Sequence, residues 1–194
     1  MRLALLKNKC LLDLKRFSQE KVVKSEWNGL KIYLERETKK ITPLFKREVN
    51  CLVAFLGTPQ KQLTKIILIT NPLDAYWRGY SFNIKGVGYL IVGPGAKRKE
   101  GRLIRHELLH LIAPAIQIPR KITTDQSHKH LIAEGYGGRQ AVNNEYVVRS
   151  LNLLYERGVI KKNISQAIKH EESNFPHIRK VMQIAMTKLK RGDQ

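Results

Sequence analysis

Residues 106–110 read His106-Glu107-Leu108-Leu109-His110, an H-E-x-x-H run inside an apolar stretch whose spacing predicts a helix. Side chains four residues apart lie one turn above each other on a helix, so His106 and His110 can bind one metal ion together. Glu107 leaves the same turn at a different angle, which suits a general base that reaches a metal-bound water without binding the metal. The run therefore predicts a Zn²⁺ site with Glu107 as the catalytic carboxylate.

The residues around this run favour a metal site over a pair of solvent-exposed histidines. The flanking positions are apolar: Leu103, Ile104, Leu111 and Ile112. Polar groups without partners are costly in such surroundings, and a shared metal ion would satisfy both imidazoles. With these flanks, the run resembles the extended signature of the zincin metallopeptidases.

A catalytic zinc commonly has three protein ligands and one open position, so a third ligand is expected further along the chain. The metzincin subclass is excluded, because Ala113 and Ile116 stand where its glycine and third histidine would be. Over residues 64–157 the chain is similar to gluzincin-type zinc metallopeptidases, including small bacterial and archaeal peptidase-like domains. Gluzincins take a glutamate from a later helix, often after an asparagine, and Asn144-Glu145 matches this pattern. The resemblance therefore implies Glu145 as the third ligand.

Other readings of this region stay open. Glu134, just before Gly135-Tyr136-Gly137-Gly138, is the alternative third ligand, and Asp125 or His128 are further candidates. The alternative for Glu145 itself is an i,i+4 ion pair with Arg149 on a helix surface. Arg149 also stands where thermolysin-like members have an aspartate that braces a zinc-bound histidine, and the interval from His110 to Glu145 is longer than theirs.

The resemblance implies a hydrolytic mechanism. Zinc would activate a water and polarise an amide carbonyl, while Glu107 accepts the proton and passes it to the leaving amine. A transition-state stabiliser is needed as well. Tyr136 and Tyr146 are the candidates, with His128 or His130 as further possibilities.

Three short strands are expected before the zinc helix. Residues 65–70, 80–84 and 87–92 are β-branched or aromatic runs, and Lys85-Gly86 supplies a hairpin turn between the last two. In zincins a strand at the edge of the sheet lines the cleft and pairs with an extended peptide. Residues 87–92 are therefore expected to be the edge that binds a peptide or protein substrate.

The rest of the chain reads as helical. Residues 25–56 form one or two amphipathic helices interrupted near Pro43, residues 138–157 form the helix that bears Glu145, and residues 163–191 form two helices broken around Asn174-Phe175-Pro176. We therefore expect an α+β, zincin-like fold, with a small mixed sheet above the H-E-x-x-H helix and a helical lower half.

Length and composition favour one domain over residues 1–194. Its parts are a helical N-terminal portion (1–60), the sheet and zinc core (64–157) and a helical C-terminal portion (158–194). Cys10 and Cys51 have no metal-binding spacing and are expected to be buried free thiols. No signal peptide or membrane-spanning stretch is recognisable, so a cytoplasmic location is expected.

The charge suggests a second class of function. Lys and Arg number 36 against 16 Asp and Glu, a net charge of +20. Such an excess attracts nucleic acid or acidic proteins by its long-range field and by counterion release. The alternative to a peptidase is therefore a basic, nucleic-acid-associated protein with an inactive or structural zincin core.

Overall fold

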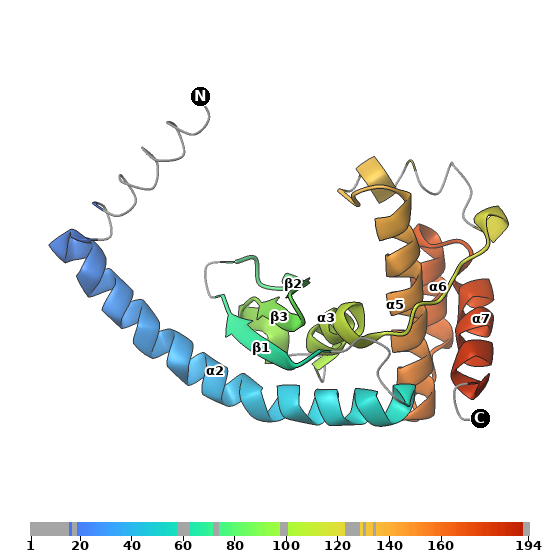
Figure 1. The fold of residues 1–194 in the computed structure, drawn as a ribbon, viewed down its shortest axis with the longest axis horizontal. Coiled ribbons are helices and arrows are strands. Elements are labelled where there is room, and N and C mark those ends of the chain that lie inside the picture. The colour runs from blue at the N-terminus through green and yellow to red at the C-terminus, as the bar shows by residue number, and fades with distance from the viewer. Residues whose placement is uncertain are drawn as a thin grey trace.

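The computed structural model describes residues 16, 19–57, 63–71, 74–97, 101–122, 129, 131–133 and 135–191. Its architecture is α+β: a three-stranded sheet and helix α3 lie between the long helix α2 and a group of C-terminal helices (Figure 1). The elements are α2 (Lys21–Leu56), β1 (Lys65–Thr70), β2 (Gly79–Ile84), β3 (Val87–Val92), α3 (Arg102–Ile112), α5 (Arg139–Gly158), α6 (Ser165–Asn174) and α7 (Ile178–Arg191), with short 3-10 turns at Pro94–Lys97 and Arg120–Ile122.

The sheet has the strand order β1-β3-β2, so β3 is its central strand. β3 pairs in parallel with β1 and antiparallel with β2. The prediction that residues 87–92 form the open edge is therefore wrong. The hairpin turn in the sequence predicts the pairing of β3 with β2. The pairing of β3 with β1 joins residues far apart in the chain, and no local pattern predicts it. The edge strand in contact with α3 is β2.

The turn between β2 and β3 forms at Lys85-Gly86, as predicted. Both residues have positive φ, 50° and 82°, as a two-residue type I′ turn requires. The side chain of Asn83 accepts a hydrogen bond from the Gly86 N–H at 3.0 Å. The turn sets the register of β2 on β3, and so decides which β2 side chains face α3.

Helix α3 packs against one face of the sheet. Gly88, Leu90 and Val92 of β3 are buried on this face, and a Cβ on Gly88 would lie 3.1 Å from the side chain of Leu111. Leu108 and Leu111 belong to the same continuous core. The apolar residues of the H-E-x-x-H stretch are therefore buried under the sheet and against α5, while His106 and His110 remain partly exposed.

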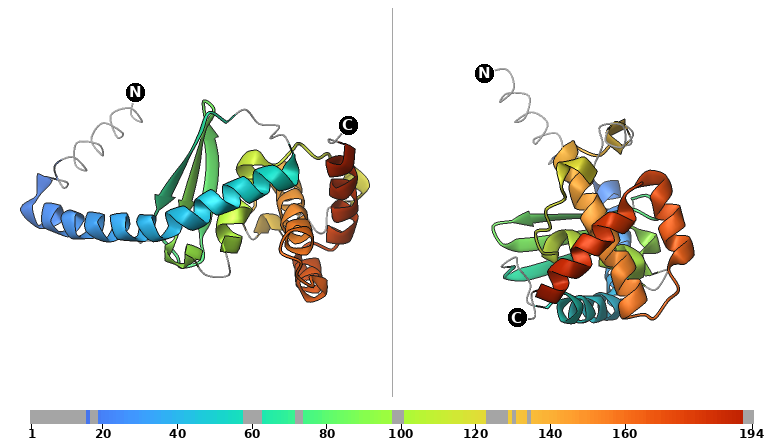
Figure 2. Two further views of the ribbon diagram at one scale, coloured as in Figure 1. Left: turned by 90° about the horizontal axis from the view of Figure 1, so that it is seen from below. Right: turned by 90° about the vertical axis from the view of Figure 1, so that its right-hand side faces the viewer.

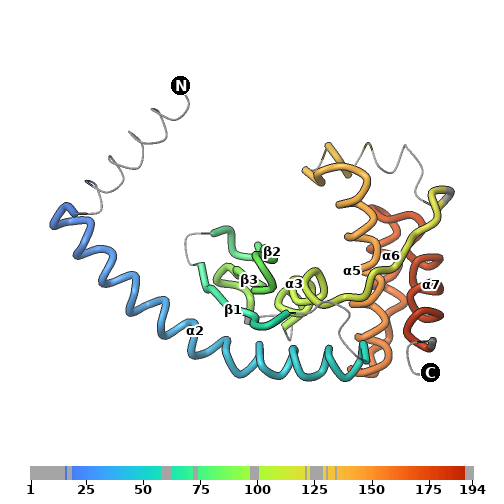
Figure 3. The backbone as a smooth tube through the Cα atoms, viewed as in Figure 1, coloured from blue at the N-terminus to red at the C-terminus, as the bar shows by residue number. Residues whose placement is uncertain are grey.

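Helix α2 continues through Pro43 as one element, seen as an unbroken run in Figure 3. The predicted interruption is wrong. Proline costs a helix one backbone hydrogen bond, but packing holds α2 on both sides of it: Ile41 and Leu52 are buried in the core. The Thr42 hydroxyl also donates to the Thr38 carbonyl at 2.7 Å.

Helices α5, α6 and α7 gather at the end of the molecule away from the N-terminal half of α2 (Figure 2). The predicted break around residues 174–176 is confirmed, since α6 ends at Asn174 and α7 begins at Ile178. Phe175, in the break, is 1% exposed and anchors this group. None of the described helices is both long and apolar enough to cross a membrane.

Candidate metal centre

His106 and His110 of α3 face Glu145 of α5, and one candidate ligand atom from each lies within 4.8 Å of the others. The two histidine Nε2 atoms are 3.3 Å apart. Glu145 Oε1 lies 3.0 Å from Nε2 of His110, and its Oε2 lies 3.6 Å from Nε2 of His106. Ligand atoms around a tetrahedral zinc with bonds of about 2.1 Å are about 3.4 Å apart. The donor set therefore fits zinc in both chemistry and spacing.

The side chain of Asn144 contacts His110 at a different ring nitrogen from Glu145. Its amide lies 3.0 Å from Nδ1 of His110. A hydrogen-bond partner at one ring nitrogen fixes the orientation of the ring, which leaves the other nitrogen for a metal. The sequence pattern Asn144-Glu145 thus places a candidate ligand next to the hydrogen-bond partner of a second candidate ligand, His110. The pattern did not reveal this role for Asn144.

Glu107 lies beside these ligands but outside the three-residue cluster. Its Oε2 accepts a hydrogen bond from the Ser81 hydroxyl of β2 at 2.9 Å. Gly79, also on β2, presses against the same side chain, since a Cβ there would lie 2.8 Å from Glu107 Cγ. The carboxylate is 7% exposed. Strand β2 therefore fixes the candidate base, and neither Gly79 nor Ser81 carried a sequence signal for this role.

Arg149 binds the other side of Glu145. Its Nε donates to Glu145 Oε2 at 3.0 Å and its Nη1 to Glu171 Oε2 at 2.8 Å. The i,i+4 pair that competed with the ligand reading is thus present together with the histidine contacts. Burial alone would raise the pKa of Glu145, but hydrogen bonds from His106 and His110 outweigh burial and hold it well below its usual range.

The ion pairs continue from Arg149 into the core. Glu171 also accepts from Arg102 at 3.1 Å, and Arg102 lies 3.5 Å from Glu156. Burial lowers the pKa of Arg149, but the carboxylates of Glu171 and Glu145 outweigh it and raise that pKa above its usual value. Alternating charges therefore link α6 and α3 to the ligand-bearing face of α5.

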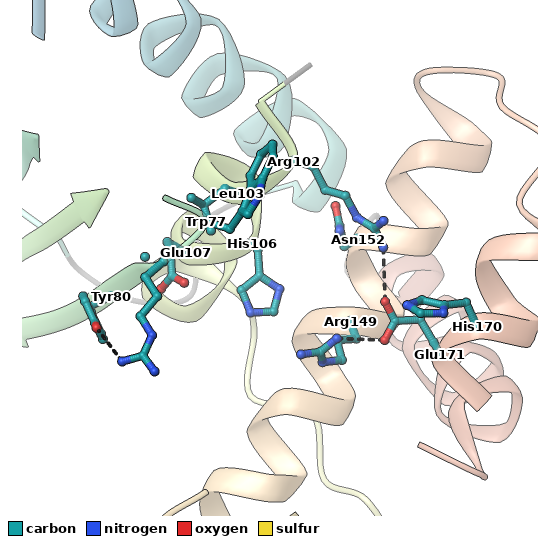
Figure 4. A pocket seen from close by; sticks show the side chains of 12 residues that line it. Trp77, Tyr80, Arg102, Leu103, His106, Glu107, Arg149, Asn152, His170 and Glu171 are labelled. Carbon is teal, nitrogen blue, oxygen red and sulfur yellow. Dashed lines mark hydrogen bonds and ion pairs between the residues drawn. The ribbon is translucent and has the colours of Figure 1, made fainter. Parts of the chain in front are cut away.

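A pocket of about 530 Å³ opens beside His106 and Glu107 (Figure 4). One wall comes from the start of β2 and the preceding loop, and the other from α5 and α6. Its lining residues include Trp77, Arg78, Tyr80, Leu103, His106, Glu107, Arg149 and His170. A substrate in this pocket would lie against His106 of the histidine–glutamate cluster and against Glu107.

The other predicted site residues are placed differently. Tyr146 is fully buried, with its ring edge-on to Phe175 at 4.9 Å between centroids, so it packs in the core rather than contacting substrate. The Tyr136 hydroxyl accepts a hydrogen bond at 3.2 Å from Arg149, the same side chain that donates to Glu145. Glu134, Asp125, His128 and His130 lie outside the described residues. Cys51 is a free thiol, only half-buried, and Cys10 lies outside the described residues.

No protein-family model matches the chain, and no curated protein or solved structure is significantly similar to it. The function must therefore be inferred from the geometry and chemistry of the site.

Proposed function

We propose that this protein is a zinc-dependent peptidase or a related amide hydrolase with a zincin-like core. The observation that carries the proposal is the convergence of His106, His110 and Glu145 from two helices, with Glu107 beside them and outside the ligand set. Three ligands with an adjacent carboxylate are typical of catalytic zinc rather than structural zinc, which is usually closed by four protein ligands.

The chemistry divides between the metal and the chain. A bound zinc ion would supply a Lewis acid for the scissile carbonyl and a water that ionises near neutral pH. Glu107 accepts a proton from the attacking water and delivers it to the leaving nitrogen. Ser81 holds Oε2 of Glu107, so the second carboxylate oxygen is the one available for proton transfer.

The substrate is an extended peptide that adds to the edge strand β2. A two-residue hairpin turn closes on a hydrogen-bonded pair, here Ile84 and Val87, and the pattern alternates from there. The backbone N–H and C=O groups of Gly79, Ser81 and Asn83 therefore point away from β3. Among the described strands none pairs with this edge, and backbone pairing along it would bring a peptide past Glu107.

Metal content and hydrolysis, measured together, test the proposal. Wild type purified without added metal or a histidine tag should hold close to one zinc per chain, as measured by elemental analysis. Glu145→Ala should lose most of that zinc. Glu107→Gln should keep it and lose cleavage of a peptide library, because Glu107 is no ligand. Glu172→Gln is the matched control, because its carboxylate pairs with Arg179 on the surface.

The contrary outcomes are distinct. Wild type that binds no zinc even when Zn²⁺ is added would rule out a metallopeptidase. The net charge of +20 would then favour the alternative, a nucleic-acid-associated protein. That function predicts DNA or RNA affinity that falls steeply with salt and survives Glu107→Gln.

A further inference from the structure

The pocket beside the candidate metal centre is lined by three arginines whose charges are compensated to different degrees: Arg78, Arg102 and Arg149. Arg149 pairs with Glu145 and Glu171, and Arg102 pairs with Glu171 and Glu156. These two guanidinium groups are therefore neutralised by carboxylates of the protein itself, and they hold α3, α5 and α6 together.

Arg78 is different, because no carboxylate of the described residues lies within ion-pair distance of it. Its Nη1 donates to the Tyr80 hydroxyl at 3.3 Å, a bond drawn as the dashed line from Tyr80 in Figure 4. Asp74 lies beyond that hydroxyl, 3.4 Å from the Tyr80 oxygen. A guanidinium group is always charged and offers five N–H donors, so Arg78 can bind an anionic group in the pocket that it lines.

The backbone of Arg78 is held firmly. Its N–H donates to the Ala75 carbonyl at 3.0 Å, and its carbonyl accepts from Gly93 at 2.9 Å. Gly93 allows this close approach, because a Cβ there would lie 2.5 Å from the Ala75 oxygen. The next residue, Gly79, touches Glu107. The backbone of Arg78 is therefore fixed, and its exposed side chain begins one residue from the point where β2 contacts Glu107.

We propose that this pocket selects peptides bearing a carboxylate group, which Arg78 binds beside the scissile bond. The inference rests on the proposed hydrolase function and names its substrate class. A guanidinium group binds a carboxylate through two parallel hydrogen bonds, which adds direction as well as charge. The net charge of +20 acts in the same sense, because its field draws acidic peptides toward the protein.

The carboxylate can come from the C-terminus of a peptide or from an acidic side chain, and three probes separate these sources. Each carries an amino-terminal hydroxamate cap to bind the metal, followed by a dipeptide. The dipeptides are leucyl-glutamine amide, which is uncharged, leucyl-glutamate amide, which has an acidic side chain, and leucyl-glutamine with a free C-terminal carboxylate. Their affinities for the zinc-loaded protein are measured by calorimetry at constant salt.

At least one acidic probe should bind wild type about tenfold more tightly than the uncharged probe, as expected for a hydrogen bond between charged groups. Arg78→Gln should abolish that difference while leaving the affinity for the uncharged probe within about twofold. Arg78→Lys should keep part of it, because it keeps the charge but loses the paired donors. Lys65→Gln on the other edge strand removes the same charge outside the pocket and should keep the difference.

The acidic probe that gains affinity identifies the source of the carboxylate. Equal affinity of all three probes for wild type would overturn the inference while leaving the hydrolase proposal intact. A difference that survives Arg78→Gln would overturn the role of Arg78. Failure of every probe to bind wild type that contains zinc would overturn the open metal position of the proposed function, and this inference with it.

Discussion

Arg149 donates a hydrogen bond from Nε to Oε2 of Glu145, one turn earlier on α5, at 3.0 Å. The same guanidinium lies over the ring of Phe175 at 4.6 Å and pairs with Glu171. Oε1 of Glu145 remains directed at His110. Arg149 therefore orients the candidate glutamate ligand.

Replacing this arginine should weaken metal binding. Arg149→Met removes the donor that orients Glu145, and changes of this kind typically reduce metal affinity by about 10- to 100-fold. Competition titration with a zinc chelator measures the change. Arg179→Met is the control, because it breaks an exposed pair with Glu172 and should leave the affinity unchanged. Unchanged affinity in Arg149→Met would show that Glu145 is oriented without Arg149.

Ser81 offers a test of the candidate base that spares the metal. Ser81→Ala removes the hydroxyl that holds Glu107 Oε2, so Glu107 should sample unproductive orientations. We expect hydrolysis of a library peptide to fall about tenfold, at the lower end of what positioned acid–base groups contribute. Zinc content should be unchanged. Ser173→Ala is the control, because Ser173 is exposed and its hydroxyl donates to the His170 carbonyl at the surface. Loss of zinc in Ser81→Ala would contradict the separation of base and ligands.

Gly79→Ala tests how closely β2 approaches α3. The added methyl group would meet Glu107 Cγ at 2.8 Å and Leu103 Cδ1 at 3.1 Å. Either strand or helix must shift, and we expect a loss of about 1–3 kcal/mol in the free energy of unfolding, as for other overpacked sites. Urea denaturation measures it.

Gly29→Ala on α2 is the control, because the same substitution is made there at an open position. Nothing lies within 4 Å of a Cβ at that position. Alanine should therefore stabilise the helix by about 0.5–1 kcal/mol. Equal effects of the two substitutions would show that β2 does not press on Glu107.

The buried arginine of α3 should be important for stability. Arg105 is 1% exposed and donates to Glu48 at 3.1 Å and to Asn152 at 2.8 Å. Arg105→Met removes the buried partner of Glu48 and leaves the exposed Arg47, at 3.1 Å, as its remaining ion-pair partner among the described residues. We expect a cost of about 3 kcal/mol in the free energy of unfolding, at the lower end of what breaking a buried ion pair costs. Adding Glu48→Leu should recover much of this loss, since the buried carboxylate is then removed as well, and Arg47 is exposed to solvent. A double variant no more stable than Arg105→Met would contradict this explanation.

The metal-free protein should lose stability in acid through Glu145. Its pKa in the folded protein lies well below its ordinary value of about 4.3. A carboxyl group with a lowered folded pKa contributes stability above its unfolded pKa, and that contribution is lost as pH falls through the folded value. Chemical denaturation of metal-free wild type should thus show stability decreasing below about pH 4.3. Glu145→Gln should have a shallower decrease, and an identical slope would contradict the pairing of Glu145 with the histidines.

Local patterns in the sequence were sufficient to predict much of this protein. The i,i+4 spacing of His106 and His110 places both rings on one face of α3, because helix geometry depends only on neighbouring residues. Lys85-Gly86 likewise forms the expected turn, since positive φ at both positions is a local requirement. The sequence motif Asn144-Glu145 was informative as well. Through the resemblance it predicted Glu145 as a candidate ligand, and the fold places Glu145 beside His106 and His110.

The tertiary structure alone decided the rest. The position of β1 determines which strands lie at the edges of the sheet. The sequence of the β2–β3 hairpin does not predict that position. Ser81 and Gly79 contact Glu107, and Arg105 reaches Glu48, only because distant elements pack together. These contacts join residues far apart in the chain, and their energies depend on burial that no local pattern specifies. The sequence alone therefore predicts the histidines and the base on their helix, whereas the packing of β2, α5 and α6 around that helix determines their surroundings.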